Sequence, residues 1–175
     1  MGVAFFYCDY RDQENQSTLN MVASILKQLI SSKPALPLPV VNLYERFEKS
    51  QNTFRLKALE PTLLLVYQEF RRSFVIIDAL DECDAVRHRK SFLQVLKGLE
   101  GTSVRLFITS RPCSGDIKRS LGAFPQVTIE ADSMDIRNFL TETIDHNDGT
   151  ADIIDEALKE DIVEGIAKRA EGMLV

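Results

Sequence analysis

A cluster of acidic residues follows a short apolar run near the middle of the chain. Residues 74–77 are all apolar, and Asp78, Asp81 and Glu82 come soon after them. A carboxylate at the end of a buried strand can hold Mg²⁺, directly or through water, beside the phosphates of a nucleotide. We therefore expect Asp78 to be a metal ligand. Asp81 or Glu82, in the following turn, is then the catalytic candidate that orients or deprotonates an attacking water.

A purely structural interpretation of this cluster stays open. Acidic residues often follow strands and cap helices, and Asp84 is well placed to cap the helix that comes next. The spacing of the acidic residues alone therefore does not decide between a phosphate-and-metal role and a structural one.

A second polar group follows another apolar run. Residues 106–108 are all apolar, and Thr109, Ser110 and Arg111 come directly after them. If the two strands are neighbours, Arg111 lies beside Asp78 and its planar set of donors can meet a γ-phosphate. The alternative is that Arg111 forms a structural ion pair with Asp78 or Asp81. The two groups together are much more specific for nucleotide chemistry than either is alone.

The elements that must position these residues alternate between strands and helices. Apolar runs predict strands at 3–8, 73–77 and 104–109, and we expect a fourth, short strand at 126–130. Helical spacing predicts helices from Ser17, over 41–49, from Pro61 onward, after Asp84, and over 117–121. Strands that are apolar on both faces are typical of a parallel sheet covered by helices, which binds ligands beyond the carboxyl ends of its strands.

The pattern changes at about Ala131. From residue 132 onward two apolar-striped segments predict helices, and no further strand is indicated. We therefore expect residues 1–131 to form an α/β nucleotide-binding domain and residues 132–175 to begin a helical domain.

Composition restricts the classes of partner. The chain has 175 residues, a formal net charge of −5 and three cysteines. The negative net charge argues against broad contact with nucleic acid. The odd number of cysteines and their wide spacing indicate a reduced intracellular protein. No apolar run approaches the roughly 18 residues needed to span a membrane. We expect a cytoplasmic protein, and we interpret the basic run at residues 87–90 as a solvent-exposed helix start.

Two segments carry a resemblance to a known family. Residues 74–83 (Phe-Val-Ile-Ile-Asp-Ala-Leu-Asp-Glu-Cys) and 106–112 (Leu-Phe-Ile-Thr-Ser-Arg-Pro) resemble the Walker B and sensor-1 segments of NACHT-type STAND NTPases. The chain is most similar to the nephrocystin-3-like N-terminal domain of many fungal NLR-like proteins. Residues 5–8 and 170–173 also resemble segments of that family, so the resemblance covers nearly the whole chain.

The resemblance implies a three-layer P-loop NTPase fold followed by a helical lid. It implies a signalling switch that binds ATP or GTP with Mg²⁺, oligomerises, and responds to a trigger sensed by repeats further along the chain. By that resemblance Asp78 would serve Mg²⁺ and Asp81 or Glu82 would serve hydrolysis. Thr109, Ser110 and Arg111 would contact the nucleotide.

One segment of the family pattern has no counterpart in the sequence. A Walker A loop needs G-x-x-x-x-G-K-[ST], and none of the eight glycines precedes a Lys-Ser or Lys-Thr pair. The family places this loop upstream of the segment where the chain begins. We therefore expect a fragment with an incomplete sheet that binds nucleotide poorly or not at all and does not hydrolyse ATP by itself.

Two alternatives remain. One is a competent switch whose phosphate loop comes from a partner chain. The other is a non-catalytic interaction module or decoy that binds protein partners, or copies of itself, through the apolar face of its C-terminal helices.

Overall fold

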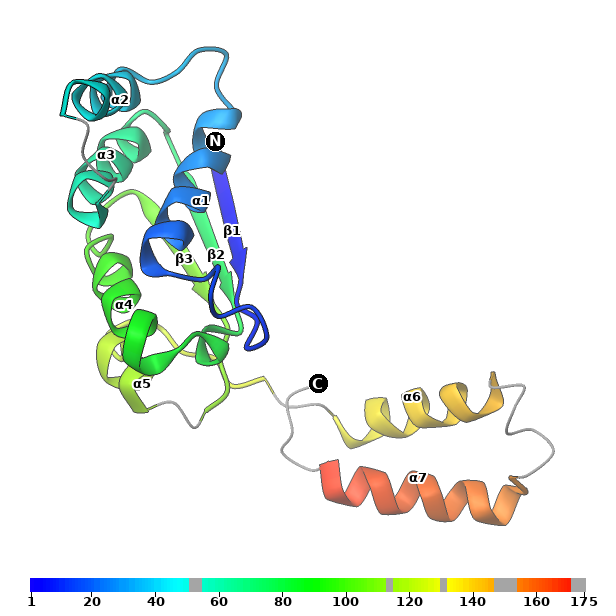
Figure 1. Cartoon of the computed structure of the whole chain (residues 1–175). Helices are drawn as coiled ribbons and strands as arrows, with labels where there is room; N and C mark the ends of the chain where they lie inside the picture. Colours follow the sequence, from blue (N-terminus) through cyan, green and yellow to red (C-terminus); the bar gives the residue numbers. More distant parts are fainter. Residues whose placement is uncertain (51–54, 113–114, 130–131, 147–153, 171–175) are drawn as a thin grey trace. The chain divides into compact units, whose positions relative to one another are not determined.

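The structure, a computed structural model, describes residues 1–50, 55–112, 115–129, 132–146 and 154–170 (Figure 1). The chain divides into two compact units, Met1–Pro125 and Gln126–Val175.

The first unit is built on a parallel three-stranded sheet. Its strands are β1 (Gly2–Tyr7), β2 (Ser73–Asp78) and β3 (Val104–Ile108), in the order β1-β2-β3. Tyr7 is level with Asp78, and Ile77 is level with Ile108. The predicted parallel α/β arrangement is therefore confirmed for these strands, and the residues that follow β2 and β3 lie at the same edge of the sheet.

Helices fill the connections between the strands (Figure 1). Ser17 begins the first of them, since its side chain accepts a hydrogen bond from the N–H of Asn20. A short 3₁₀ turn (Leu80–Glu82) and a π-helical turn (Ala85–Arg89) link β2 to the fourth helix. The α-helices of this unit are α1 (Thr18–Ser31), α2 (Leu38–Ser50), α3 (Leu56–Gln68), α4 (Lys90–Lys97) and α5 (Gly115–Leu121).

The two faces of the sheet differ in burial. On one face Ala4, Val75 and Ile77 are 0 % exposed, because helices pack against them and enclose the hydrophobic core (Figure 1). On the other face Phe5 is 48 % exposed and Phe107 is 61 % exposed. The strands are apolar on both faces as predicted, but the helices of the first unit cover only one.

The outer edge of β1 is partly occupied by a side chain from α1. The N–H of Phe5 donates to Gln28 Oε1 over 3.0 Å, and the carbonyl of Phe5 accepts from Gln28 Nε2 over 2.8 Å. Gln28 therefore satisfies the main-chain groups of Phe5 that point away from β2.

Two local predictions were wrong. Residues 126–129 form no strand, and Val127 and Ile129 are exposed. Alternating polarity does not create a strand where no neighbour offers a hydrogen-bonding edge. Helix α3 begins at Leu56, so Pro61 lies inside the helix rather than opening it. The buried Leu59 and Leu63 on either side of the proline outweigh the one hydrogen bond that it removes.

The described residues of the second unit form two helices that pack against each other. Helix α6 (Ser133–Asp145) is capped by Asp132, which accepts from the N–H of Met134, and α7 (Glu156–Ala170) lies beside it (Figure 1). Their contact buries Ile136, Val163 and Ala167. Four apolar side chains of the pair stay exposed: Met134, Phe139, Leu158 and Ile166. In the described part of the chain, none of the helices combines the length and hydrophobicity of a membrane-spanning segment.

Candidate functional site

The turn after β2, residues 78–84, is called the acidic turn below. Ala79 lies in the left-handed region at φ 50°, which reverses the chain at the end of the strand. Leu80 is fully buried and anchors the turn in the core. Strand β3 also holds the turn, since Thr109 accepts the N–H of Ala79 through its hydroxyl over 2.9 Å and the N–H of Leu80 through its carbonyl over 3.0 Å.

Thr109 also fixes the carboxylate of Asp78. Its hydroxyl donates to Asp78 Oδ1 over 2.5 Å. Among the described residues no donor reaches Asp78 Oδ2, so that oxygen is available to another ligand. The two sequence groups therefore meet at the carboxyl edge of the sheet, with Thr109 positioning Asp78.

Arg111 is engaged with the two other acidic residues of the turn. Its N–H donates to Asp81 Oδ1 over 3.0 Å, its Nε lies 3.3 Å from Asp81 Oδ2, and its Nη2 donates to Glu82 Oε1 over 2.9 Å. The Arg111 side chain is 65 % exposed. The ion-pair alternative therefore describes this geometry, with Asp81 and Glu82 as the partners. Ser110, whose hydroxyl donates to the carbonyl of Arg111, makes no hydrogen bond to the acidic turn.

Arg89 supports the acidic turn from the interior. The residue is buried, and its Nη1 donates to the carbonyl oxygens of Asp81, over 2.7 Å, and Cys83, over 3.1 Å. Its Nε donates to Asp116 Oδ2 in α5 over 2.8 Å. Our interpretation of the basic run as wholly solvent-exposed is wrong for this residue.

A sequence signal for the burial of Arg89 exists. Arg89 precedes Phe92, Leu93 and Leu96 by three, four and seven residues, which places it on the apolar face of the helix that follows. The burial of Arg89 was missed because a run of charged residues suggests exposure. In a helix, however, neighbouring residues of such a run point to different faces.

Two carboxylates near the turn have lowered pKa values. The hydrogen bond and charge of Arg89 hold the pKa of Asp116 below its usual range. The N–H groups of Arg87 and Val86 donate to Asp84 and lower its pKa in the same way. The expectation that Asp84 caps the next helical segment is confirmed.

A polar loop, residues 9–16, also crosses the acidic turn. The N–H of Tyr10 donates to Glu82 Oε2 over 3.2 Å. Gln13 Nε2 donates to the carbonyl of Glu82 over 2.7 Å, and Gln13 Oε1 accepts the N–H of Asp84 over 2.8 Å. The loop lies between the strand predicted at 3–8 and the helix predicted from Ser17, but nothing in the sequence indicated which turn it would contact. Glu82 is thus shared between the loop and Arg111.

Two cysteines lie buried beside the site as free thiols. Burial raises the pKa of Cys8 to about 12, with further contributions from Cys83 and Asp78. Burial raises the pKa of Cys83 to about 11, against the opposing charge of Arg89. Both thiols are protonated near neutral pH and are poor nucleophiles. The third cysteine, Cys113, lies outside the described residues.

The donor set at the acidic turn fits Mg²⁺ in one way. Within the residues that the structure describes, no group of three or more His, Cys, Asp or Glu could hold a metal ion. Mg²⁺ beside phosphates, however, needs only one or two carboxylates, since waters and phosphate oxygens complete its shell. The Asp78 carboxylate could be such a ligand through its Oδ2.

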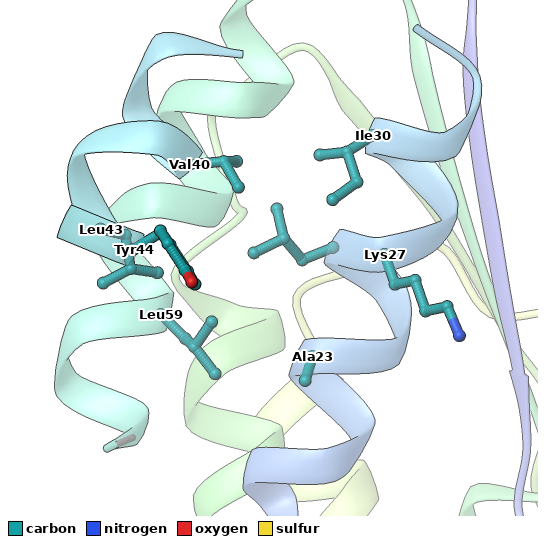
Figure 2. Close-up of a pocket in the computed structure, with 8 residues that line it drawn as sticks. Ala23, Lys27, Ile30, Val40, Leu43, Tyr44 and Leu59 are labelled. Atoms are coloured by element: carbon teal, nitrogen blue, oxygen red, sulfur yellow. The ribbon is translucent and has the colours of Figure 1, made fainter. Parts of the chain in front are cut away.

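An apolar pocket lies away from these residues, between α1, α2 and α3 (Figure 2). Leu26, Leu43 and Leu59 contribute to its wall, and the Lys27 side chain extends away from it. Among the described residues that line it, Lys27 and Tyr44 are polar and none is Asp, Glu, His, Cys, Ser or Thr, so the acidic turn remains the candidate site.

A family model described as "Nephrocystin 3, N-terminal" matches residues 1–111. The matched segment contains all three strands, the acidic turn and Arg111. No curated protein and no solved structure matches the chain.

Proposed function

The chain belongs to the nephrocystin 3 N-terminal family, and from that premise we propose that it is the magnesium- and phosphate-sensing part of a nucleotide-dependent signalling switch. One observation carries the proposal. Asp78, whose Oδ2 no donor of the described residues reaches, ends β2, and the exposed Arg111 follows the neighbouring parallel strand β3 at the same edge of the sheet. Ligands of such sheets bind at that edge. The resemblance to NACHT-type STAND NTPases supports ATP or GTP as the ligand. It also supports the cytoplasm as the location of the protein.

Each residue has a proposed task. Asp78 would hold Mg²⁺ through Oδ2, directly or through water, and Thr109 keeps that carboxylate oriented. Arg111 would leave its carboxylate partners and donate to the terminal phosphate. Bound Mg²⁺ would supply charge neutralisation for the phosphates. Asp81 or Glu82, released from Arg111, would then be able to accept a proton from an attacking water.

These residues form only part of a nucleotide site. The 175 residues contain no G-x-x-x-x-G-K-[ST] loop. Such a loop would supply the main-chain N–H groups and the lysine that surround the phosphates. We propose that the chain alone binds Mg²⁺–nucleotide weakly, with a dissociation constant of about 1 mM or higher, and does not hydrolyse it.

The test is a titration of the 175-residue chain with Mg²⁺–ATP and Mg²⁺–GTP, followed residue by residue with NMR. We expect weak binding, with shift changes confined to the acidic turn and to residues 109–111. Asp78→Asn should abolish those changes. The matched control Asp161→Asn, at an exposed position of α7, should leave them intact.

Two results would contradict the proposal. Micromolar affinity would show that the chain holds a complete site. Shift changes elsewhere in the chain, or binding that survives Asp78→Asn, would show that the acidic turn is not the site.

A second candidate function is a protein-interaction module without nucleotide chemistry. The pairing of Arg111 with Asp81 and Glu82 favours it, because those charges already satisfy one another. A ligand that binds only the folded state raises its melting temperature. A melting temperature that 10 mM Mg²⁺–ATP leaves unchanged would therefore favour this second function.

A further inference from the structure

The carboxylate of Glu82 is shared between two segments of the chain. Its Oε1 accepts from Arg111 Nη2 over 2.9 Å, and its Oε2 accepts from the N–H of Tyr10 over 3.2 Å. The Glu82 side chain is 21 % exposed, whereas the Arg111 side chain is 65 % exposed. Because both carboxylate oxygens are engaged and the carboxylate is the less exposed partner, Arg111 is the side chain that can leave this pair.

Loop 9–16 also fixes the main chain on both sides of Cys83. Gln13 Nε2 donates to the carbonyl of Glu82 over 2.7 Å, and Gln13 Oε1 accepts the N–H of Asp84 over 2.8 Å. One amide side chain therefore satisfies a main-chain acceptor and a main-chain donor of the acidic turn. The loop thus holds Glu82 at its carbonyl as well as at its carboxylate.

The part of the loop that contacts Glu82 is itself anchored. Gln16, which is 4 % exposed, accepts the N–H of Asp9 over 3.1 Å and donates to the carbonyl of Asp9 over 2.7 Å. Asp9 directly precedes Tyr10, whose N–H reaches Glu82. The position of that N–H is therefore set by a buried side chain and does not depend on Arg111.

This arrangement makes Glu82 a better partner for Arg111 than a free surface carboxylate would be. A surface ion pair is weak partly because two long side chains must be held in one geometry. Here the loop already orders Glu82, so only Arg111 loses conformational freedom when the pair forms. Asp81 differs, because the hydrogen bond that it accepts from Arg111 comes from the main-chain N–H and does not depend on the guanidinium.

We propose that loop 9–16 positions Glu82 as an intramolecular competitor of phosphate for Arg111, so that the ligand-free chain keeps its own phosphate-binding arginine occupied. This competition rests on the function proposed above and regulates the same site. A carboxylate and a phosphate are both anions that accept charge-assisted hydrogen bonds from a guanidinium, so Arg111 exchanges one for the other. Gln13 acts through Glu82 and is a positioning residue.

The first test is an NMR titration of the full chain with Mg²⁺–ATP. Glu82→Gln keeps the shape of the side chain and removes its charge, so the dissociation constant should fall about threefold. Gln13→Leu keeps the charge of Glu82 but releases its main chain, and the constant should fall about twofold. The control Glu14→Gln removes a carboxylate from an exposed position of the same loop and should leave the constant unchanged. Circular dichroism melting of each variant shows whether it is folded.

The direction of the Gln13→Leu effect separates the proposal from two simpler explanations. A merely structural role of Gln13 predicts weaker binding, because a disturbed turn would misplace Asp78. Charge repulsion between Glu82 and phosphate, without placement by the loop, predicts no gain, because this variant retains the carboxylate. Tighter binding by Gln13→Leu is expected only if the loop holds Glu82 against Arg111.

The second test follows the Arg111 side chain without any ligand. Nitrogen-15 relaxation of its Nε–H group reports motion on the picosecond-to-nanosecond timescale. We expect this group to be more mobile in Glu82→Gln and in Gln13→Leu than in the wild type. Its mobility should be unchanged in Glu14→Gln.

Three results would overturn the proposal and leave the proposed function intact. Wild-type binding of Mg²⁺–ATP with no gain in Glu82→Gln would show that Glu82 does not compete with phosphate. A gain in Glu82→Gln without one in Gln13→Leu would show that the loop does not position the competitor. Unchanged mobility of Arg111 in both variants would show that Glu82 does not hold it. Absence of Mg²⁺–ATP binding in the wild type and in every variant would instead overturn the proposed function, and the competition with it.

Discussion

Two arginines contact the same acidic turn from opposite sides, and they do so in different ways. The Arg89 side chain is 10 % exposed and donates to main-chain carbonyl oxygens of the turn. The Arg111 side chain is 65 % exposed and pairs with side-chain carboxylates of Asp81 and Glu82. The buried arginine therefore fixes the path of the backbone, whereas the exposed one can exchange its partners for a ligand.

The energetic reason is the difference in solvation. Removing one partner of a buried charged group leaves the others without hydrogen bonds in a low-dielectric interior, which is strongly destabilising. An exposed ion pair is replaced by water at little cost. Substitutions around the turn can test this contrast between the buried and the exposed arginine.

The largest effect is expected for Arg89→Met. The substitution leaves the carbonyl oxygens of Asp81 and Cys83 without their donor, so unfolding free energy should fall by about 3 kcal/mol. Chemical denaturation measures it. Arg87→Met, a control at an exposed position in the same π-helical turn, should change it by less than about 0.5 kcal/mol. Equal losses for the two variants would remove the distinction between buried and exposed arginines.

A smaller loss is expected for Thr109→Val. The isosteric substitution removes both the acceptor for the N–H of Ala79 and the donor to Asp78, so unfolding free energy should fall by about 1–2 kcal/mol. Thr109→Ser keeps the hydroxyl and should retain most of the stability. If Thr109→Val were as stable as the wild type and Thr109→Ser were destabilised, the methyl group rather than the hydrogen bonds would be the stabilising part.

Asp116→Asn should reduce stability by roughly 1 kcal/mol, because its carboxylate is one-third exposed and water replaces part of the interaction with Arg89. The pKa of Asp116 is lowered in the folded state from its ordinary value of 3.8. Its contribution is therefore fully present well above pH 3.8 and is lost as the pH falls through the lower, folded value. Denaturation curves at several acidic pH values should converge for the wild type and the variant; a gap that persists in acid would contradict this sign.

The smallest effect on stability is expected for Arg111→Gln. Its partners Asp81 and Glu82 lie at a wet edge, so unfolding free energy should change by less than about 0.5 kcal/mol. The same variant should lose the weak nucleotide-dependent shifts described above. A large destabilisation would make Arg111 a structural residue like Arg89 and would favour the interaction-module function.

The sequence predicts the part of the site that depends on strand order. Apolar runs at β2 and β3 place Asp78 and Thr109 at strand ends, and a parallel pairing then brings them together. Arg89 and Gln13 could not be identified in this way. Their roles depend on how a helix face and a loop pack across the turn, which tertiary contacts determine rather than local pattern.

The same limit explains the predicted strand at 126–130, where an alternating pattern lacked a pairing partner in the described structure. Local preference is sufficient when each element has a neighbour to confirm it, as for β1 against β2. Local preference does not predict a strand correctly where the presence of a pairing neighbour determines whether the strand forms.

Gln28 has a further consequence for how the chain can associate. An open strand edge is a template onto which another chain can add, and it is a common route to aggregation. By taking up both main-chain groups of Phe5, the Gln28 amide acts as a one-residue substitute for a fourth strand and blocks lengthwise extension past β1. Because the outer edge of β1 is occupied at Phe5, other chains cannot add to the sheet there one after another. The protein is therefore protected at this edge from the growth of fibres.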